Sequence, residues 1–115
     1  MAVTKAQLEK MILAFPGARE GTAYGYPAWR IGEKSFTRLR DEDNSLVIHV
    51  DGFDERDMLL DSDPKVFHIT DHYKNSKIVL ARIDKIDRKH LQAFLNRRFR
   101  AVASKKVVKA WEEGK

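Results

Sequence analysis

The sequence contains no cysteine, which excludes disulfide bonds, thiolate metal sites and a cysteine nucleophile. It also has no apolar run near the roughly 20 residues that cross a bilayer, so we expect no membrane partner. Residues 1 to 15 alternate apolar and charged positions and lack the continuous apolar core of a secretion signal. These absences predict a protein that stays in the cytoplasm.

The composition is that of one globular domain. In 115 residues, 43% are hydrophobic and 34% are charged, which is typical of neither a disordered nor a membrane chain. A chain of this length holds one modest core. We therefore predict a single domain spanning residues 1 to 115, which is a monomer and carries no cofactor.

Three capping signals predict helices. Thr4 and Gln7 have the spacing of a capping box, and apolar residues then recur at helical spacing until the proline and glycine at 16 and 17. Asp54 is placed to cap a short helix through Leu60, and Asp87 to cap a long helix near the carboxyl end. We expect the first and last of these to be the main helices of the fold.

The long carboxyl-terminal helix is expected to break. Continued straight, it would bring Lys106 and Lys109 onto the apolar stripe of the helix, towards the core. A break near Ser104, whose hydroxyl would cap a terminal segment, avoids this. Arg98 lies on the same stripe, and we expect its aliphatic stem to lie along it with the guanidinium at the edge.

Runs of alternating apolar residues predict a sheet of about five strands. Trp29, Ile31 and Phe36 should face the core from a hairpin that turns at Gly32. The fold class is therefore α+β, an antiparallel sheet covered on one face by the amino- and carboxyl-terminal helices. The expected strands are residues 28–31, 35–39, 45–50, 66–70 and 77–83.

This order of elements, together with several short motifs, resembles the MmcQ/YjbR family over nearly the whole chain. The resemblance implies a CyaY-like fold. The family is described as DNA-binding through a double-wing arrangement, so the resemblance also implies DNA as a partner. The residues that carry it are Gly25-x-Pro27-Ala28-Trp29, Lys34-x-Phe36, His72-Tyr73 and the run RRFRAVASKK from Arg97 to Lys106.

The net charge of +5 is unevenly distributed. Residues 1–40 carry +4, residues 41–87 carry −6 and residues 88–115 carry +7. A basic end of this kind attracts the phosphates of a nucleic acid whatever its base sequence, because binding releases the cations condensed on the nucleic acid. The leading hypothesis is therefore DNA binding without sequence preference, in which the contacting residues are Arg97, Arg100, Lys105, Lys106 and Lys109, helped by Arg38 and Arg40 on the hairpin.

Three alternatives stay open at this point. The basic residues could be a solvated helix face, or the opposed charges could serve a protein-interaction module with an acidic protein partner. The stretch GTAYGYPAWRIGEKSF, residues 21 to 36, could have a purely structural role in the fold. It could instead contribute to a groove in which a flat ligand stacks. That groove would be lined by Tyr24, Tyr26, Trp29, Lys34 and His72.

Metal binding and catalysis are not expected. The four histidines show none of the spacings of zinc sites, and no glycine-rich phosphate loop is present. Asp71, His72 and Tyr73 are consecutive, so their side chains should point in different directions, and the sequence places no nucleophile beside them. We predict a binding protein and no enzyme.

Overall fold

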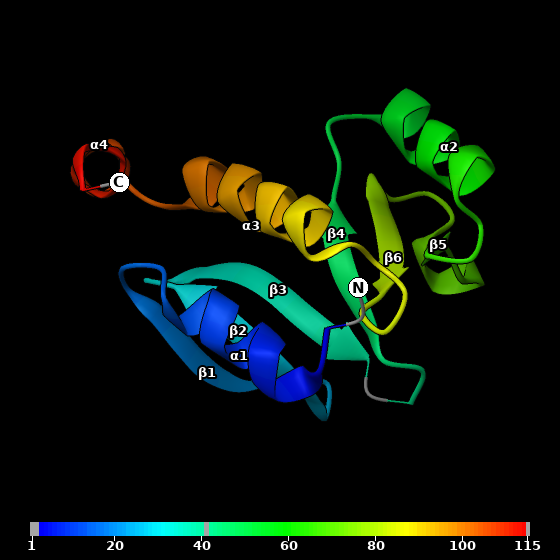
Figure 1. Ribbon diagram of the computed structural model, residues 1–115, viewed down its shortest axis with the longest axis horizontal. Coiled ribbons are helices and arrows are strands. Elements are labelled where there is room, and N and C mark those ends of the chain that lie inside the picture. Colours follow the sequence, from blue (N-terminus) through cyan, green and yellow to red (C-terminus); the bar gives the residue numbers. More distant parts are fainter. Residues whose placement is uncertain (1–2, 41, 115) are drawn as a thin grey trace.

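The computed structural model describes residues 3–40 and 42–114, which form one six-stranded antiparallel sheet and four α-helices. The strand order is β1-β2-β3-β4-β6-β5, so only β5 lies out of chain order (Figure 1). This confirms the predicted α+β class. The elements are α1 (Lys5–Leu13), β1 (Ala18–Ala23), β2 (Tyr26–Ile31), β3 (Lys34–Arg40), β4 (Ser45–His49), α2 (Phe53–Ser62), β5 (Phe67–His68), the short 3₁₀ helix η1 (Asp71–Tyr73), β6 (Ile78–Arg82), α3 (Arg88–Val102) and α4 (Lys105–Glu113).

The core lies between one face of the sheet and the helices α1 and α3 (Figure 1). Trp29, Phe36 and Phe99 are fully buried there, as expected for the two hairpin residues, and Ile31 joins them. Burying one such aromatic side chain contributes roughly 2 to 3 kcal/mol. We call the opposite face of the sheet the open face.

The predicted helix starts are confirmed at three places. Thr4 and Gln7 form a reciprocal capping box, with distances of 2.9 and 3.1 Å between the paired atoms. Asp87 accepts from two backbone amides at the start of α3, and the Ser104 hydroxyl accepts from the Val107 amide at the start of α4. The chain therefore breaks where a straight helix would have buried lysines. Each cap stabilises its helix by about 1 kcal/mol.

Two predictions need correction. Gly52 occupies the N-cap position of α2 without a side-chain hydrogen bond, and Asp54 lies inside the first turn, where a carboxylate interacts favourably with the positive end of the helix dipole. The edge strand β1 was not predicted, because its sequence AREGTA has no apolar alternation. Its residues are mostly exposed, so hydrogen bonding to β2 defines the strand without a buried face.

The turn between β1 and β2 contains only two residues. Ala23 pairs with Tyr26, and the intervening Tyr24 and Gly25 have φ of 54° and 80°. Positive φ at both positions is the type I′ turn that matches the twist of a hairpin. The turn holds the Tyr24 side chain at the tip of the hairpin, where it is 89% exposed.

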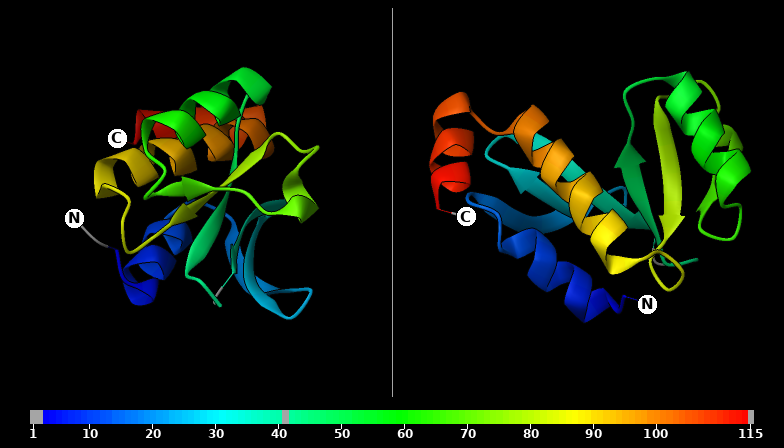
Figure 2. Two further views of the ribbon diagram at one scale, coloured as in Figure 1. Left: turned by 90° about the vertical axis from the view of Figure 1, so that its right-hand side faces the viewer. Right: turned by 45° about the horizontal axis from the view of Figure 1, so that its top comes forward.

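The open face carries a small second cluster of buried residues. Val47 and Leu80 are buried beneath Tyr73 of η1, with Ile78 against them. Two segments rise above this face on different sides (Figure 2). They are residues 69–77, which contain η1, and the tip of the β1–β2 hairpin. The hairpin and η1 form the walls of the site described below.

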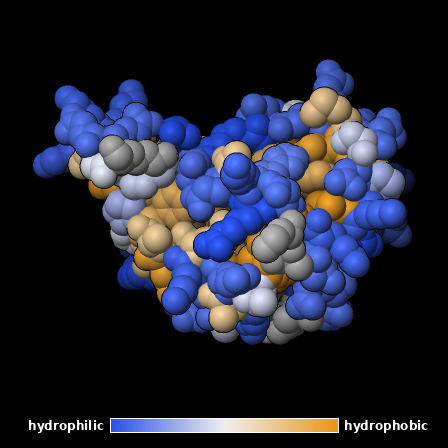
Figure 3. Space-filling model, in the orientation of Figure 1, coloured by the Kyte–Doolittle hydropathy of each residue, from blue (hydrophilic) through white to orange (hydrophobic). Residues whose placement is uncertain are grey.

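Hydrophilic and hydrophobic residues are unevenly distributed on the surface. Figure 3 shows hydrophilic residues covering the end formed by α4, with apolar surface beneath that helix. Across residues 3–40 and 42–114, no helix has the length and apolar character needed to span a membrane.

A candidate ligand pocket on the open face

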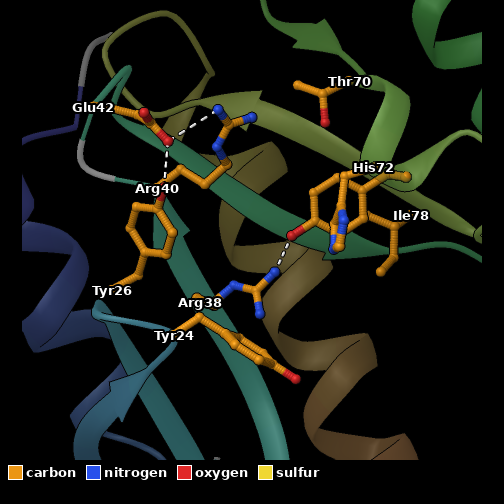
Figure 4. Close-up of a pocket in the computed structure, with 9 residues that line it drawn as sticks. Tyr24, Tyr26, Arg38, Arg40, Glu42, Thr70, His72 and Ile78 are labelled. Carbon is orange, nitrogen blue, oxygen red and sulfur yellow. Dashed lines mark hydrogen bonds and ion pairs between the residues drawn. The ribbon is translucent and has the colours of Figure 1, made fainter.

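A pocket of about 610 Å³ lies on the open face, between the hairpin tip and η1. Its floor comes from β3 and β6, and its walls from the β1–β2 turn and from residues 70 to 73 (Figure 4). The volume is in the range of pockets that bind small molecules. The lining residues are Tyr24, Tyr26, Arg38, Arg40, Glu42, Thr70, His72, Tyr73 and Ile78.

The structure brings together three of the five residues expected in a groove. Tyr24, Tyr26 and His72 line this pocket, although His72 is far from the two tyrosines in the sequence. Trp29 is fully buried on the helix-covered face, so its inclusion was wrong. The prediction for Lys34 was also wrong. This residue begins β3, next to the β2–β3 turn and far from the β1–β2 turn, and it lines a different hollow. Alternation along β2 explains the error for Trp29, since neighbouring residues face opposite sides.

Arg38 lies at the centre of the pocket, between two tyrosine rings. Its guanidinium carbon is 5.3 Å from the centre of the Tyr24 ring and 5.9 Å from the centre of the Tyr73 ring. One terminal nitrogen donates to the Tyr73 hydroxyl, and Nε is buried without a hydrogen-bond partner. Among the described residues, no carboxylate lies within salt-bridge distance of Arg38. The guanidinium is therefore held in position, and no acidic side chain of residues 3–40 and 42–114 compensates its charge.

Arg40, two residues further along β3, is in the opposite state. Its guanidinium is 3.1 Å from the Glu42 carboxylate and 4.0 Å from that of Asp43. The Tyr26 hydroxyl also donates to Glu42 (Figure 4). These hydrogen bonds, first from Tyr26 and then from Arg40, lower the pKa of Glu42 below its ordinary value. The wall formed by these residues is thus ionised and internally paired.

The Tyr24 backbone is strained for its residue type. A non-glycine residue with positive φ costs of the order of 1 kcal/mol, and asparagine is the usual occupant of this turn position. The side chain gains little packing in return, because it is 89% exposed. The strain places an aromatic ring over Arg38 at the mouth of the pocket, which is the arrangement expected of a contact with a ligand.

The opposite wall comes from η1. The exposed ring of His72 packs edge-on against the ring of Tyr73, with 4.8 Å between their centres. Tyr73 itself is buried and reaches Arg38 from a point 35 residues away in the chain. Tyr73, Thr70 and Glu42 were not among the predicted site residues. The sequence signal for Tyr73 was its place in the His72-Tyr73 motif. A buried tyrosine hydroxyl needs a hydrogen-bond partner, and here that partner is Arg38.

The basic residues predicted on α3 are individually neutralised. Arg97 is 2.9 Å from the Glu55 carboxylate and 3.6 Å from that of Asp51. Burial raises the pKa of Glu55, but the hydrogen bonds from the Asp51 amide and from Arg97 outweigh it, so this pKa lies below its ordinary value. The guanidinium of Arg98 donates to the backbone carbonyls of Ser35 and Phe36 in β3, which fits the expectation that it lies at the edge of the apolar stripe.

Arg100 is also paired, 2.8 Å from the Glu112 carboxylate and stacked on the Trp111 ring at 5.0 Å. Lys105, Lys106 and Lys109 on α4 are exposed, and no carboxylate of the described residues is within salt-bridge distance of them. They lie on α4, at the left-hand end of the molecule in Figure 1, and none of them lines the pocket. The seven predicted cations therefore do not form one surface, because Arg38 and Arg40 belong to the pocket.

No metal centre is evident in the part of the chain that the structure describes, since no three histidine or carboxylate side chains there could hold an ion. Ser45, His68 and Asp43 lie close together without forming a catalytic triad. The Ser45 hydroxyl and the Asp43 carboxylate are 2.7 and 3.8 Å from the same nitrogen of His68, and Ser45 is fully buried. A relay needs the base and its orienting carboxylate on different ring nitrogens.

Comparison with known proteins identifies the family of the chain. No curated protein and no solved structure matches it. The family model for YjbR matches residues 13–101, which is well over half of the chain and includes every residue that lines the pocket. This confirms the resemblance drawn from the motifs, and the chain belongs to the YjbR family.

Proposed function

We propose that this member of the YjbR family is a binding protein for a small anion that carries an aromatic or heterocyclic ring, held in the pocket on the open face. The observation that carries the proposal is Arg38, whose guanidinium lies between two tyrosine rings without a carboxylate partner among the described residues. The proposal retains the expectation of a monomer that acts in the cytoplasm.

The chemistry of the pocket supports such a ligand. One terminal nitrogen of the Arg38 guanidinium donates to Tyr73, and the other makes no hydrogen bond to the described residues, so it can donate to an oxygen of a phosphate or carboxylate. The exposed ring of Tyr24 offers a face on which a second flat ring can stack. Anion and ring would thus be recognised by neighbouring side chains, which is the usual arrangement of a few polar groups in a mainly apolar pocket.

We propose binding alone and assign no reaction to the pocket. Among its lining residues, Thr70 carries a hydroxyl of the kind that a base can activate, but no hydrogen bond joins this hydroxyl to His72 in the described residues. The His72 ring lies against Tyr73, which orients it as a wall of the pocket.

Calorimetric titration with phenyl phosphate and with its two fragments, phenol and inorganic phosphate, tests the proposal. We expect phenyl phosphate to bind about tenfold more tightly than either fragment, because only it reaches both Arg38 and a tyrosine face. Arg38→Ala should weaken its binding by about tenfold or more, since hydrogen bonds to charged groups contribute about 1.5 to 3 kcal/mol. Arg30→Ala is the matched control, because Arg30 is an exposed arginine of β2 that does not line the pocket.

Equal affinity for phenyl phosphate in the Arg38→Ala and Arg30→Ala variants would contradict the proposal. The same conclusion would follow if the wild-type protein bound none of the three compounds.

DNA binding is the second candidate, favoured by the three exposed lysines of α4. Since Arg97 and Arg100 are paired with carboxylates, we propose that only Lys105, Lys106 and Lys109 would contact phosphates. Neutralising three phosphates predicts a slope of about −3 in a plot of log affinity against log salt concentration. These contacts would hold the backbone and read no bases.

A salt titration with a duplex oligonucleotide tests this second candidate. Charge reversal at Lys105 and Lys109 should flatten the slope, whereas reversal at Lys65, an exposed lysine far from α4 in the sequence, should not. Absence of binding at low salt would rule the candidate out. A slope unaffected by the α4 substitutions would assign the binding to another surface.

A further inference from the structure

The pocket makes three chemical demands on a ligand at three separate places. Arg38 calls for an anion, and the rings of Tyr24 and His72 call for a flat group. Glu42 calls for a hydrogen-bond donor, because both of its hydrogen bonds reach Oε1 and its other oxygen has no partner among the described residues. The three groups come from different segments and line one pocket, in which Glu42 lies beside Tyr26 and Arg40, apart from Arg38 and His72 (Figure 4).

We propose that the ligand is a nucleoside monophosphate, with its phosphate on Arg38, its base against the aromatic walls and a neutral hydroxyl or amino group donating to Glu42. This inference rests on the proposed function and narrows it to one chemical class.

The charges around the pocket select a ligand with one anionic group. Among the described residues, Arg38 has no carboxylate within salt-bridge distance, whereas the charge of Arg40 is balanced by Glu42 and Asp43. In that part of the chain, a second or third phosphate would meet no further unpaired arginine of the pocket. It would instead approach the Glu42 carboxylate, and like charges in contact repel by about 1 kcal/mol or more near a protein surface.

The same charges select neutral donors over a ligand ammonium group. The hydrogen bonds that Glu42 accepts lower its pKa, so its carboxylate is ionised near neutral pH and accepts well. An ammonium that reached this carboxylate would lie beside the Arg40 guanidinium, which is 3.1 Å from Oε1. A zwitterionic aromatic amino acid therefore fits less well than a ribose hydroxyl or the exocyclic amine of a base.

The two sides of the pocket suit a base and a phosphate together. Tyr24 presents its ring from the hairpin tip, and the ring of His72 stands on the opposite wall. Thr70, above His72 in Figure 4, adds a hydroxyl that can donate a hydrogen bond to a ligand on this side of the pocket. Each stacked base–aromatic contact contributes about 1 to 3 kcal/mol in proteins that bind nucleic-acid bases.

Titration of the wild-type protein with AMP, adenosine, ADP and L-phenylalanine tests the inference. We expect AMP to bind about tenfold more tightly than adenosine, which lacks the anion, and more tightly than ADP or L-phenylalanine. A 5′-phosphorylated oligothymidylate distinguishes a free nucleotide from a strand end, and we expect it to bind no more tightly than TMP.

The Glu42→Gln variant gives a sharper readout of the charge argument. Removing this carboxylate leaves Arg40 with less compensation, so the preference for AMP over ADP should shrink or reverse. Glu33→Gln is the matched control, since Glu33 is an exposed glutamate in the turn at the other end of the hairpin. An effect on general stability would change the affinities for AMP and ADP together, and only the charge argument predicts a change in their ratio.

The outcomes separate the inference from the proposed function. If phenyl phosphate binds and AMP binds no more tightly than adenosine, the inference fails and the proposed function stands. If neither phenyl phosphate nor AMP binds, both fail. Tighter binding of ADP than AMP by the wild-type protein, or of the oligothymidylate than TMP, would also overturn the inference, because either result requires further unpaired cations.

Discussion

The molecule holds two arginine–aromatic arrangements, one at α4 and one at the tip of the β1–β2 hairpin, and they differ in how the arginine is paired. At the α4 end, Arg100 stacks on Trp111 and pairs with Glu112. At the hairpin end, Arg38 stacks on Tyr24 and Tyr73 with no carboxylate within reach among the described residues. The difference shows that a count of basic residues does not predict where positive charge remains available to a ligand.

The aromatic residues differ in the same way. Trp111 packs on Phe15 and Phe99, with ring centres 5.6 and 4.8 Å away, so it fastens α4 to the core. Tyr24 is held over Arg38 by a strained turn and remains 89% exposed. One end therefore uses its rings for stability, and we infer that the other keeps them for recognition.

The largest expected effect concerns stability at the α4 end. Phe99→Ala removes a fully buried ring that contacts both Phe15 and Trp111, and should lower the free energy of unfolding by about 3 to 5 kcal/mol. Tyr24→Ala is the counterpart at the hairpin end and should change it by less than about 1 kcal/mol. Urea denaturation measures both. Similar losses in the two variants would remove the distinction between the ends.

The next effect concerns the pH dependence of stability and involves His49, a partly buried histidine near Arg98 of α3 and Arg38 of the pocket. Burial, and then the positive charges of Arg98 and Arg38, lower the pKa of His49 from 6.5 to about 4. The unfolded chain takes up a proton below pH 6.5 that the folded chain does not, so stability should fall as the pH is lowered through this range. The loss by pH 4 should be on the order of 3 kcal/mol.

The pH dependence can be assigned to His49 by substitution. His49→Gln should remove most of the fall in stability between pH 6.5 and 4, measured by denaturation at a series of pH values, and the remainder should come from His68, whose pKa burial also lowers. His72→Gln, at an exposed position in η1, should leave the fall unchanged. A flat wild-type profile over this range would show that the folded protein accepts the proton on His49.

A smaller effect is expected at the hairpin tip, where stability and binding should move in opposite directions. Tyr24→Asn places the preferred residue at a positive φ and should raise stability by up to about 1 kcal/mol. The same change removes the stacking face, so phenyl phosphate should bind more weakly. Tyr24→Phe, which keeps the ring, should alter neither quantity. If Tyr24→Asn binds as the wild type does, the ring has no part in recognition.

The smallest effect is expected from the surface ion pair between α3 and α4. Arg100 and Glu112 have side chains that are 45% and 48% exposed, and exposed pairs of this kind contribute about 0 to 1 kcal/mol. A double-mutant cycle with alanine at both positions should give a coupling energy in that range, and added salt should reduce it. A larger, salt-independent coupling would mean that the pair fixes the position of α4.

Most of the fold could be predicted from local signals, because those signals act within a few residues. The capping residues Thr4, Asp87 and Ser104 each bond to the backbone two or three positions away, and each prediction was confirmed. The strand β1 could not be predicted in the same way. It is an exposed edge strand held by its pairing with β2, so no buried face marks it in the sequence.

The site was less predictable, because it depends on contacts between distant segments. Sequence patterns indicated Tyr24, Tyr26 and His72, but the partner of Arg38 is Tyr73, 35 residues away. Whether an arginine is paired depends on similar separations, as with Arg97 and Glu55, 42 residues apart. Local periodicity gives no information at that range, and the net charge of the carboxyl-terminal segment misled the prediction of a single basic surface.

The central claim is that Arg38, and neither Arg97 nor Arg100, is the arginine that meets an anion. Nitrogen-15 NMR spectra of the arginine side chains, recorded during titration with phenyl phosphate, test it directly. We expect the Nε–H resonance of Arg38 to shift progressively, because this nitrogen is buried without a partner in the pocket, while those of Arg97 and Arg100 stay in place. Shifts at Arg97 and Arg100 with Arg38 unchanged would contradict the account.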